Sequence, residues 1–165
     1  MMEVSRTYGN LMVLSNRLSD KIKKFGIDSV PGPALGGIVD YPSLARRAGL
    51  GEYGRHGLLI SEYSGSCQRI GAVFTNLRLP MEHDNSHGWV REFCNGCGKC
   101  IRGCPVGAIR EEAVAVRGGH FSCVVHDRCL PYFSKNYGCS ICIKECPFTT
   151  LGYNRIKTAF FRSKK

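Results

Sequence analysis

Eight of the ten cysteines in this 165-residue chain are grouped in two runs with the spacing of metal ligands. The first run reads C-x2-C-x2-C-x3-C-P, and the second reads C-x9-C-x2-C-x3-C-P. Two-residue gaps allow a tight loop to place three thiolates around one face of an inorganic cluster, which is chemistry suited to moving electrons. The runs consist of Cys94, Cys97, Cys100 and Cys104, followed by Cys129, Cys139, Cys142 and Cys146.

The first run matches the spacing of bacterial ferredoxins, in which the fourth cysteine ligates the other cluster of a pair. We therefore predict two 4Fe-4S clusters and a role in electron transfer. In this arrangement the last cysteine of each run ligates the cluster of the other run. The expected ligands of the first cluster are Cys94, Cys97, Cys100 and Cys146, and those of the second are Cys104, Cys129, Cys139 and Cys142.

Glycine and proline near the cysteines support this interpretation. Gly96 and Gly98 suit a tight loop, because glycine reaches positive φ at little cost and lets the backbone approach a ligand closely. Pro105 and Pro147 follow the last cysteine of each run and are expected to turn the chain away from the cluster.

Other uses of the cysteines remain open at this stage. Structural zinc also uses C-x2-C pairs and four thiolates, although three cysteines at two-residue gaps followed by C-P are unusual for zinc. Disulfides are a weaker alternative, because no secretory segment opens the chain. The two cysteines outside the pattern differ. Cys123 reads as a small buried residue of a strand, and Cys67 lies in a Ser/Gly turn with no evident base or metal partner.

The chain is basic, with a formal net charge of +10. Two oxidised clusters with their thiolates would each contribute about −2, leaving roughly +6. A positive charge of this size is compatible with binding nucleic acid, an acidic redox partner or an anionic cofactor, or with solubility alone. The charge by itself does not distinguish these possibilities. The absence of an apolar run of about 20 residues or of a signal peptide leads us to expect no membrane span and a cytoplasmic location.

The first half of the chain predicts helices and strands in mixture. Apolar residues spaced by three or four predict an amphipathic helix over residues 8–25 that ends at Gly26. A turning segment precedes a second helix over residues 41–48, capped by Asp40. Residues 57–60 and 69–76 are the best strand candidates, and we expect them to pair.

The second half carries the cysteine runs between short elements. Residues 111–125 predict a hairpin that turns at Gly118 and Gly119. Asp127 is expected to cap a short helix that includes Cys129 and ends near Gly138. A basic stretch with Phe160 and Phe161 closes the chain, and we expect it to be frayed or docked on the protein.

The block AGLGEYGRHGLLI at residues 48–60 precedes SGS at 64–66, RIGAVFTNLRLP at 69–80 and both cysteine runs. In this order the motifs resemble the iron–sulfur and cobalamin-dependent reductases, which include epoxyqueuosine reductase and the reductive dehalogenases. The resemblance covers about residues 41–148. It implies a corrinoid beside one cluster, with electrons passing through both clusters to the cobalt.

The resemblance also implies a fold and cofactor contacts. We expect an α+β chain with three regions: a truncated α/β region of the corrinoid-reductase type at residues 1–90, a ferredoxin-like two-cluster domain at 91–152, and a basic tail at 153–165. Gly51 and Gly54 would let the backbone approach the cofactor, and Arg55 would lie near the catalytic chamber. Cobalamin is accordingly a candidate cofactor.

The chain departs from the family in two ways. Only 47 residues precede Ala48, which suggests either a truncated relative or an electron carrier that works with a partner reductase subunit. Epoxyqueuosine reductases place a catalytic aspartate thirteen residues before the alanine of the AGLG block, where this chain has Leu35. We therefore do not expect tRNA as a partner.

Three hypotheses follow. We favour an electron-transfer module that serves a corrinoid or a partner reductase. The second hypothesis is a complete cobalamin-dependent reductase of an organic substrate, and the third is a basic nucleic-acid-binding protein with structural clusters. A complete enzyme would need proton donors, although each candidate is more readily explained as a surface or packing residue: Tyr41, Arg55, Tyr63, His83 and His87.

Overall fold

The structure is a computed structural model that describes residues 2–35, 39–80, 86–116 and 120–164. The chain forms two compact units. The first unit combines Met1–Ala48 with Arg69–His83, and the second combines Gly49–Gln68 with Asp84–Lys165. Each unit is therefore assembled from segments that are separated in the sequence.

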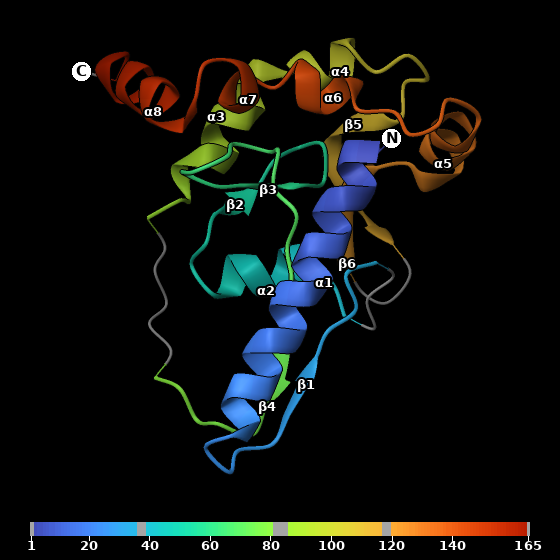
Figure 1. Cartoon of the computed structure of the whole chain (residues 1–165). Coiled ribbons are helices and arrows are strands. Elements are labelled where there is room, and N and C mark those ends of the chain that lie inside the picture. The colour runs from blue at the N-terminus through green and yellow to red at the C-terminus, as the bar shows by residue number, and fades with distance from the viewer. Residues whose placement is uncertain (1, 36–38, 81–85, 117–119, 165) are drawn as a thin grey trace. The chain divides into compact units, whose positions relative to one another are not determined.

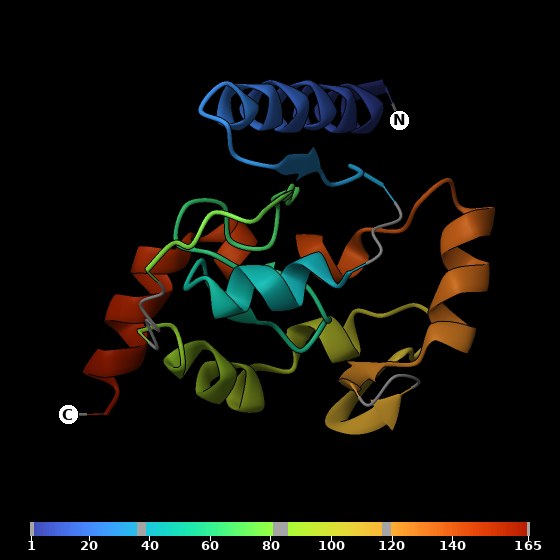
Figure 2. The same ribbon diagram turned by 90° about the horizontal axis from the view of Figure 1, so that it is seen from below.

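The first unit is a long helix on a two-stranded antiparallel sheet. Helix α1 packs against the sheet, and Figure 2 shows this blue helix running along strand β1. Strands β1 and β4 pair so that Val30 lies opposite Phe74. The elements are α1 (Met2–Lys23), β1 (Ser29–Pro31), α2 (Tyr41–Arg47) and β4 (Val73–Thr75).

The first helix is confirmed as a helix, but its buried face differs from the one that its apolar residues predict. Leu14 and Leu18 are 61% and 51% exposed, whereas Ser15 and Ser19 are buried. The Ser19 hydroxyl accepts a hydrogen bond of 3.0 Å from the hydroxyl of Ser29 in β1. Small serines thus allow close packing on the sheet, and the leucine side chains lie outside this contact.

The second unit contains most of the helices and the cysteine runs. Strands β2 and β3 form one antiparallel pair, and β5 and β6 form another. Figure 1 shows the short helices α3, α4, α5 and α6 that carry cysteines, and α7, which begins directly after Cys146. The elements are β2 (Glu52–Tyr53), β3 (Leu59–Ile60), α3 (Trp89–Cys97), α4 (Lys99–Arg102), β5 (Ile109–Val116), β6 (His120–Val124), α5 (His126–Lys135), α6 (Ile141–Lys144), α7 (Pro147–Thr150) and α8 (Tyr153–Arg162).

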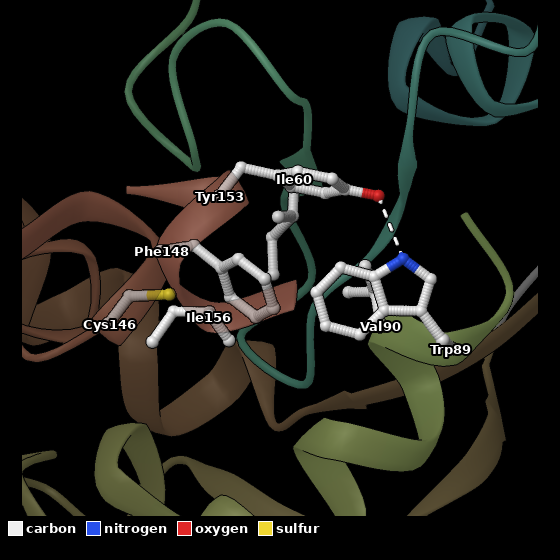
Figure 3. Close-up of a cluster of buried hydrophobic side chains, with 7 residues drawn as sticks. All are labelled: Ile60, Trp89, Val90, Cys146, Phe148, Tyr153 and Ile156. Atoms are coloured by element: carbon white, nitrogen blue, oxygen red, sulfur yellow. Dashed lines mark hydrogen bonds between the residues drawn. The ribbon is translucent and has the colours of Figure 1, made fainter. Parts of the chain in front are cut away.

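The core of the second unit is an aromatic cluster that joins β3, α3, α7 and α8. The indole Nε1 of Trp89 donates a hydrogen bond of 3.0 Å to the hydroxyl of Tyr153, as Figure 3 shows. Phe148 packs against both rings. The buried members are Ile60, Trp89, Val90, Cys146, Phe148, Tyr153 and Ile156. Because Cys146 belongs to this core, the aromatic packing positions one of the predicted ligands.

Several predicted elements are confirmed. The helix after Asp40 forms as α2, and the hairpin forms as β5 and β6, although its turn at Gly118 and Gly119 lies outside the described residues. The final stretch is docked rather than frayed: α8 buries Tyr153 and Ile156 in the core.

Two local predictions are wrong. The strand candidates at residues 57–60 and 69–76 do not pair with each other, because β3 pairs with β2 and β4 pairs with β1. The helix predicted to begin at Asp127 has its N-cap at Val125, so Asp127 lies in the first turn. Asp127 is well placed there too, because a carboxylate in the first turn interacts favourably with the helix dipole.

The fold mixes helices and strands, as predicted for an α+β chain. Among the described residues, all named strand pairs are antiparallel. Within the same residues, no helix is both long enough and apolar enough to span a bilayer.

Candidate metal centre

Four thiols from both cysteine runs surround a pocket in the second unit. The cavity between them is small, about 20 Å³. Aromatic side chains form much of the remaining wall. The lining residues are Arg55, His56, Phe93, Cys94, Cys97, Gly98, Cys100, Cys146, Pro147 and Phe148. The structure thus brings together the four cysteines that the sequence assigns to a first cluster.

Short helices hold these cysteines in place. Helix α3 ends at Cys97, and Gly98 then takes a φ of +59°, which starts α4 in a new direction. This conformation favours glycine, as the spacing predicted for Gly98. Gly96 differs, because it lies within α3 and needs no unusual backbone. Pro147 opens α7 directly after Cys146, where its missing N–H costs no helical hydrogen bond.

Hydrogen-bond donors surround the sulfur atoms at this pocket. The backbone N–H of Arg55 donates to the Cys94 thiol. Cys146 receives hydrogen bonds from the backbone of Phe148 and Thr149 and from the side chain of Ser66. Such donors stabilise negative charge on sulfur and tune the potential of a bound cluster.

Burial and mutual repulsion disfavour bare thiolates here. Burial raises the pKa of Cys94 to about 11, an effect opposed by the Arg55 hydrogen bond and reinforced by the charges of Cys146 and Cys97. Burial, followed by the charges of four neighbouring cysteines, raises the pKa of Cys100 to about 12. Bound cationic iron would offset this repulsion, because metal ligation deprotonates thiols. The donor set therefore fits an iron–sulfur cluster.

The remaining four cysteines form a second group. Burial and then the charges of Cys104 and Cys139 raise the pKa of Cys129. The pKa of Cys142 is raised by burial and by the charges of Cys139, Cys129 and Cys104. The backbone N–H of Ala108 donates to the Cys104 sulfur at 3.2 Å. These four side chains correspond to the predicted second ligand set, and their ligation of iron stays a prediction.

The two groups are neighbours. The charge of Cys142, from the second group, contributes to the raised pKa of Cys100 in the first. Two clusters at these positions would therefore lie close to each other, which is the arrangement needed for electrons to pass between them. Among the described residues, no three His, Cys, Asp or Glu side chains are arranged to hold a single metal ion.

The two cysteines outside the pattern stand apart from both groups. Cys67 is exposed, and its thiol lies 3.9 Å from the Thr149 hydroxyl. Cys123 lies in β6, which confirms the predicted strand, but it is half-buried and not fully buried as predicted.

The three residues predicted to contact a corrinoid have contacts within the protein. A Cβ at Gly51 would overlap the Ile60 carbonyl, and a Cβ at Gly54 would lie 2.6 Å from the His56 ring. The guanidinium of Arg55 donates to the Asn95 side chain at 2.7 Å. Both glycines thus have a packing explanation, and a corrinoid role for the three residues stays a prediction.

The structure also locates most of the candidate proton donors. The Tyr41 hydroxyl donates to the Pro33 carbonyl at 2.8 Å in the first unit. Tyr63 is 96% exposed. His87 Nδ1 lies 2.6 Å from the Tyr153 hydroxyl, which makes it part of the core network. His83 lies outside the described residues, and Arg55 lines the pocket.

Two residues were missed from the sequence: His56, which lines the pocket, and Ser66, which bonds to Cys146. Both belong to motifs that carry the family resemblance, His56 directly after Arg55 and Ser66 at the end of SGS. Their positions within these motifs were the available signal. Neither residue type is a usual ligand of a four-cysteine cluster, so the cysteine pattern itself did not indicate them.

Comparison with known proteins supports the iron–sulfur interpretation. Residues 88–109 match the family described as a 4Fe-4S binding domain. The chain is 38% identical over 109 residues to a tetrachloroethene reductive dehalogenase of Desulfitobacterium hafniense, covering 66% of this chain and 19% of that protein. It is 29% identical over 150 residues to an epoxyqueuosine reductase of Aliivibrio fischeri, covering 84% of this chain and 37% of that protein.

A solved reductive dehalogenase, described as suggesting a mechanism for B12-dependent dehalogenation, shares the fold. The TM-score is 0.69 at 23% sequence identity, and the match covers 80% of this chain and 20% of that one. The resemblance drawn from the sequence is thus confirmed: the chain carries a 4Fe-4S domain and is homologous to reductive dehalogenases and epoxyqueuosine reductases. It spans between about a fifth and two fifths of the length of these relatives.

Proposed function

We propose that this chain is an iron–sulfur electron-transfer module with two 4Fe-4S clusters that passes electrons to a corrinoid or to a partner reductase. The observation that carries the proposal is the arrangement of the eight cysteines in two adjacent groups, each drawn from both runs. A 4Fe-4S cluster supplies a site that accepts and releases one electron. The proposed setting is the cytoplasm.

The surrounding residues fit this role. Backbone and hydroxyl donors point at the sulfur atoms of Cys94 and Cys146, and they would stabilise the more negative reduced state. Phe93 and Phe148 form apolar walls that limit access of water to the pocket. All four cysteines of the second group are partly exposed, which suits exchange of electrons with a partner, because electron exchange requires close approach.

The relatives favour a second candidate, a complete cobalamin-dependent reductase. The epoxyqueuosine reductases and the reductive dehalogenases that this chain resembles are enzymes, and the chain matches part of their length. In that case the α/β region at residues 1–90 would contribute to a corrinoid site. Under either proposal, tRNA is not an expected partner.

The test is anaerobic reconstitution with iron and sulfide, with and without cobalamin, followed by iron counting and EPR of the reduced protein. We expect about eight irons per chain, interacting EPR signals and no retained corrinoid. Retention of base-off cobalamin would instead support the complete reductase. Stoichiometric zinc, or only about four irons, would overturn the two-cluster proposal.

A further inference from the structure

His56 is a buried side chain with one unexplained polar atom at the candidate metal centre. It is 6% exposed and lines the pocket with Cys94, Cys97, Cys100 and Cys146. The Nε2 atom is buried and has no hydrogen-bond partner among the described residues. A buried polar atom without a hydrogen-bond partner destabilises the folded protein, so we expect a bound group to supply the missing partner.

The other ring nitrogen settles which atom carries the proton. The backbone N–H of Leu58 donates to Nδ1 of His56 at 3.2 Å, so Nδ1 is an acceptor. Because Nδ1 accepts, it carries no proton and the ring is neutral. In a neutral imidazole whose Nδ1 accepts, the proton is on Nε2. His56 therefore presents a donor that is not satisfied by the protein.

The local chain holds this donor at the wall of the pocket that the four thiols line. A Cβ at Gly54 would lie 2.6 Å from Cε1 and 3.0 Å from Nε2 of His56, so the ring occupies the space that glycine leaves free. Arg55 already donates its backbone N–H to the Cys94 thiol. Among the side chains that line the pocket, the cysteines are the acceptors, because the others are apolar or, like Arg55, donors.

We propose that Nε2–H of His56 donates a hydrogen bond to a sulfur atom of the cluster held by Cys94, Cys97, Cys100 and Cys146, and that this bond raises the reduction potential of that cluster. The inference rests on the proposed function, since it requires the first cluster. A donor to sulfur stabilises the reduced state more than the oxidised state, because reduction adds negative charge. His56 is a positioning and tuning residue, not a ligand.

The experiment compares His56→Leu with His56→Gln in the reconstituted full chain by anaerobic redox titration followed by EPR. The leucine variant lacks a donor, and the glutamine variant keeps an N–H. We expect the leucine variant to disfavour reduction of the first cluster about tenfold, which is about 59 mV for a one-electron couple. Glutamine should restore much of the difference, and the second cluster of the same molecule serves as the internal control.

A second measurement uses the wild-type protein labelled with ¹⁵N-histidine. Pulsed EPR of the reduced first cluster should show a ¹⁵N coupling that His56→Gln removes. Unchanged potentials in both variants, or no ¹⁵N coupling in wild type, would overturn the inference. If His56→Leu fails to retain the first cluster, the ¹⁵N measurement decides alone. A wild-type protein that never binds about eight irons would instead overturn the proposed function.

Discussion

At the scale of single residues, Cys146 links the two cysteine runs. It belongs to the second run in sequence, yet it lines the pocket with Cys94, Cys97 and Cys100. It is also buried in the aromatic core and receives hydrogen bonds from two backbone N–H groups and from Ser66. Its position at the pocket depends on how α7 packs against segments that are distant in the sequence.

Cys146→Ser should therefore remove the cluster of the first group and leave the second. Iron content should fall from about eight to about four, and EPR should retain a single reduced cluster. The matched control is Cys67→Ser, which changes an exposed thiol outside both groups and should keep all the iron. Loss of the cluster that Cys139 and Cys142 help to form would contradict the exchanged ligand sets.

Tyr153 provides a second test at the residue scale. Tyr153→Phe removes the hydroxyl that accepts the hydrogen bond from the Trp89 indole at 3.0 Å. The buried indole N–H would lose this partner, so we expect the free energy of unfolding to fall by about 1–3 kcal/mol. Denaturant unfolding measures the change. Tyr63→Phe is the control, because Tyr63 is 96% exposed and should change stability little.

At the scale of elements, the loop after β3 packs closely on α7. Gly65 has a φ of +57°, and a Cβ there would overlap the Phe148 carbonyl oxygen. The adjacent Ser66 bonds the Thr149 hydroxyl at 2.8 Å. This contact holds α7, and with it Cys146, at the pocket.

Gly65→Ala should consequently destabilise the protein by more than about 1 kcal/mol, through backbone strain and the clash with Phe148. It should also slow reconstitution of the first cluster. Thermal unfolding and iron uptake measure the two effects. Gly9→Ala is the opposite case: Gly9 lies within α1 with open space around it, and alanine there should stabilise by about 0.5–1 kcal/mol. A stable Gly65→Ala protein with normal iron uptake would argue against this role of the loop.

At the scale of the whole molecule, the two compact units differ in their dependence on metal. All eight predicted ligands belong to the second unit, whereas the first unit is a helix on a small sheet. In the second unit several cysteines have a raised pKa because of burial and neighbouring charges. Bound iron would relieve this repulsion and link the short helices that carry or flank the cysteines.

Removal of iron by an anaerobic chelator should therefore loosen the second unit selectively. Hydrogen exchange followed by mass spectrometry should show lost protection around α3, α4 and α6, with α1 unchanged. Uniform loss of protection, or none, would contradict a metal-dependent second unit. Restoring iron and sulfide should return the original exchange pattern, which separates metal loss from irreversible unfolding.

Much of the candidate site could be predicted from the sequence because its signals are local. Ligand spacing, the glycine at position 98 and the proline after each run depend on the chain within a few residues. The helix at α2 and the β5–β6 hairpin were predictable for the same reason. The family resemblance extended these signals, and the comparisons confirm it.

The tertiary structure alone decided the partners of these segments. The two strand candidates predicted to pair with each other pair with β2 and β1 instead. In α1, Ser15 and Ser19 are buried, whereas Leu14 and Leu18 are exposed. His56 lines the same pocket as the four thiols. Each of these results depends on which surfaces meet when distant segments pack. The free energy of that packing cannot be inferred from residues that are close together in the sequence. The sequence determined which residues are proposed to bind iron, and the packing of distant segments determined which of them meet.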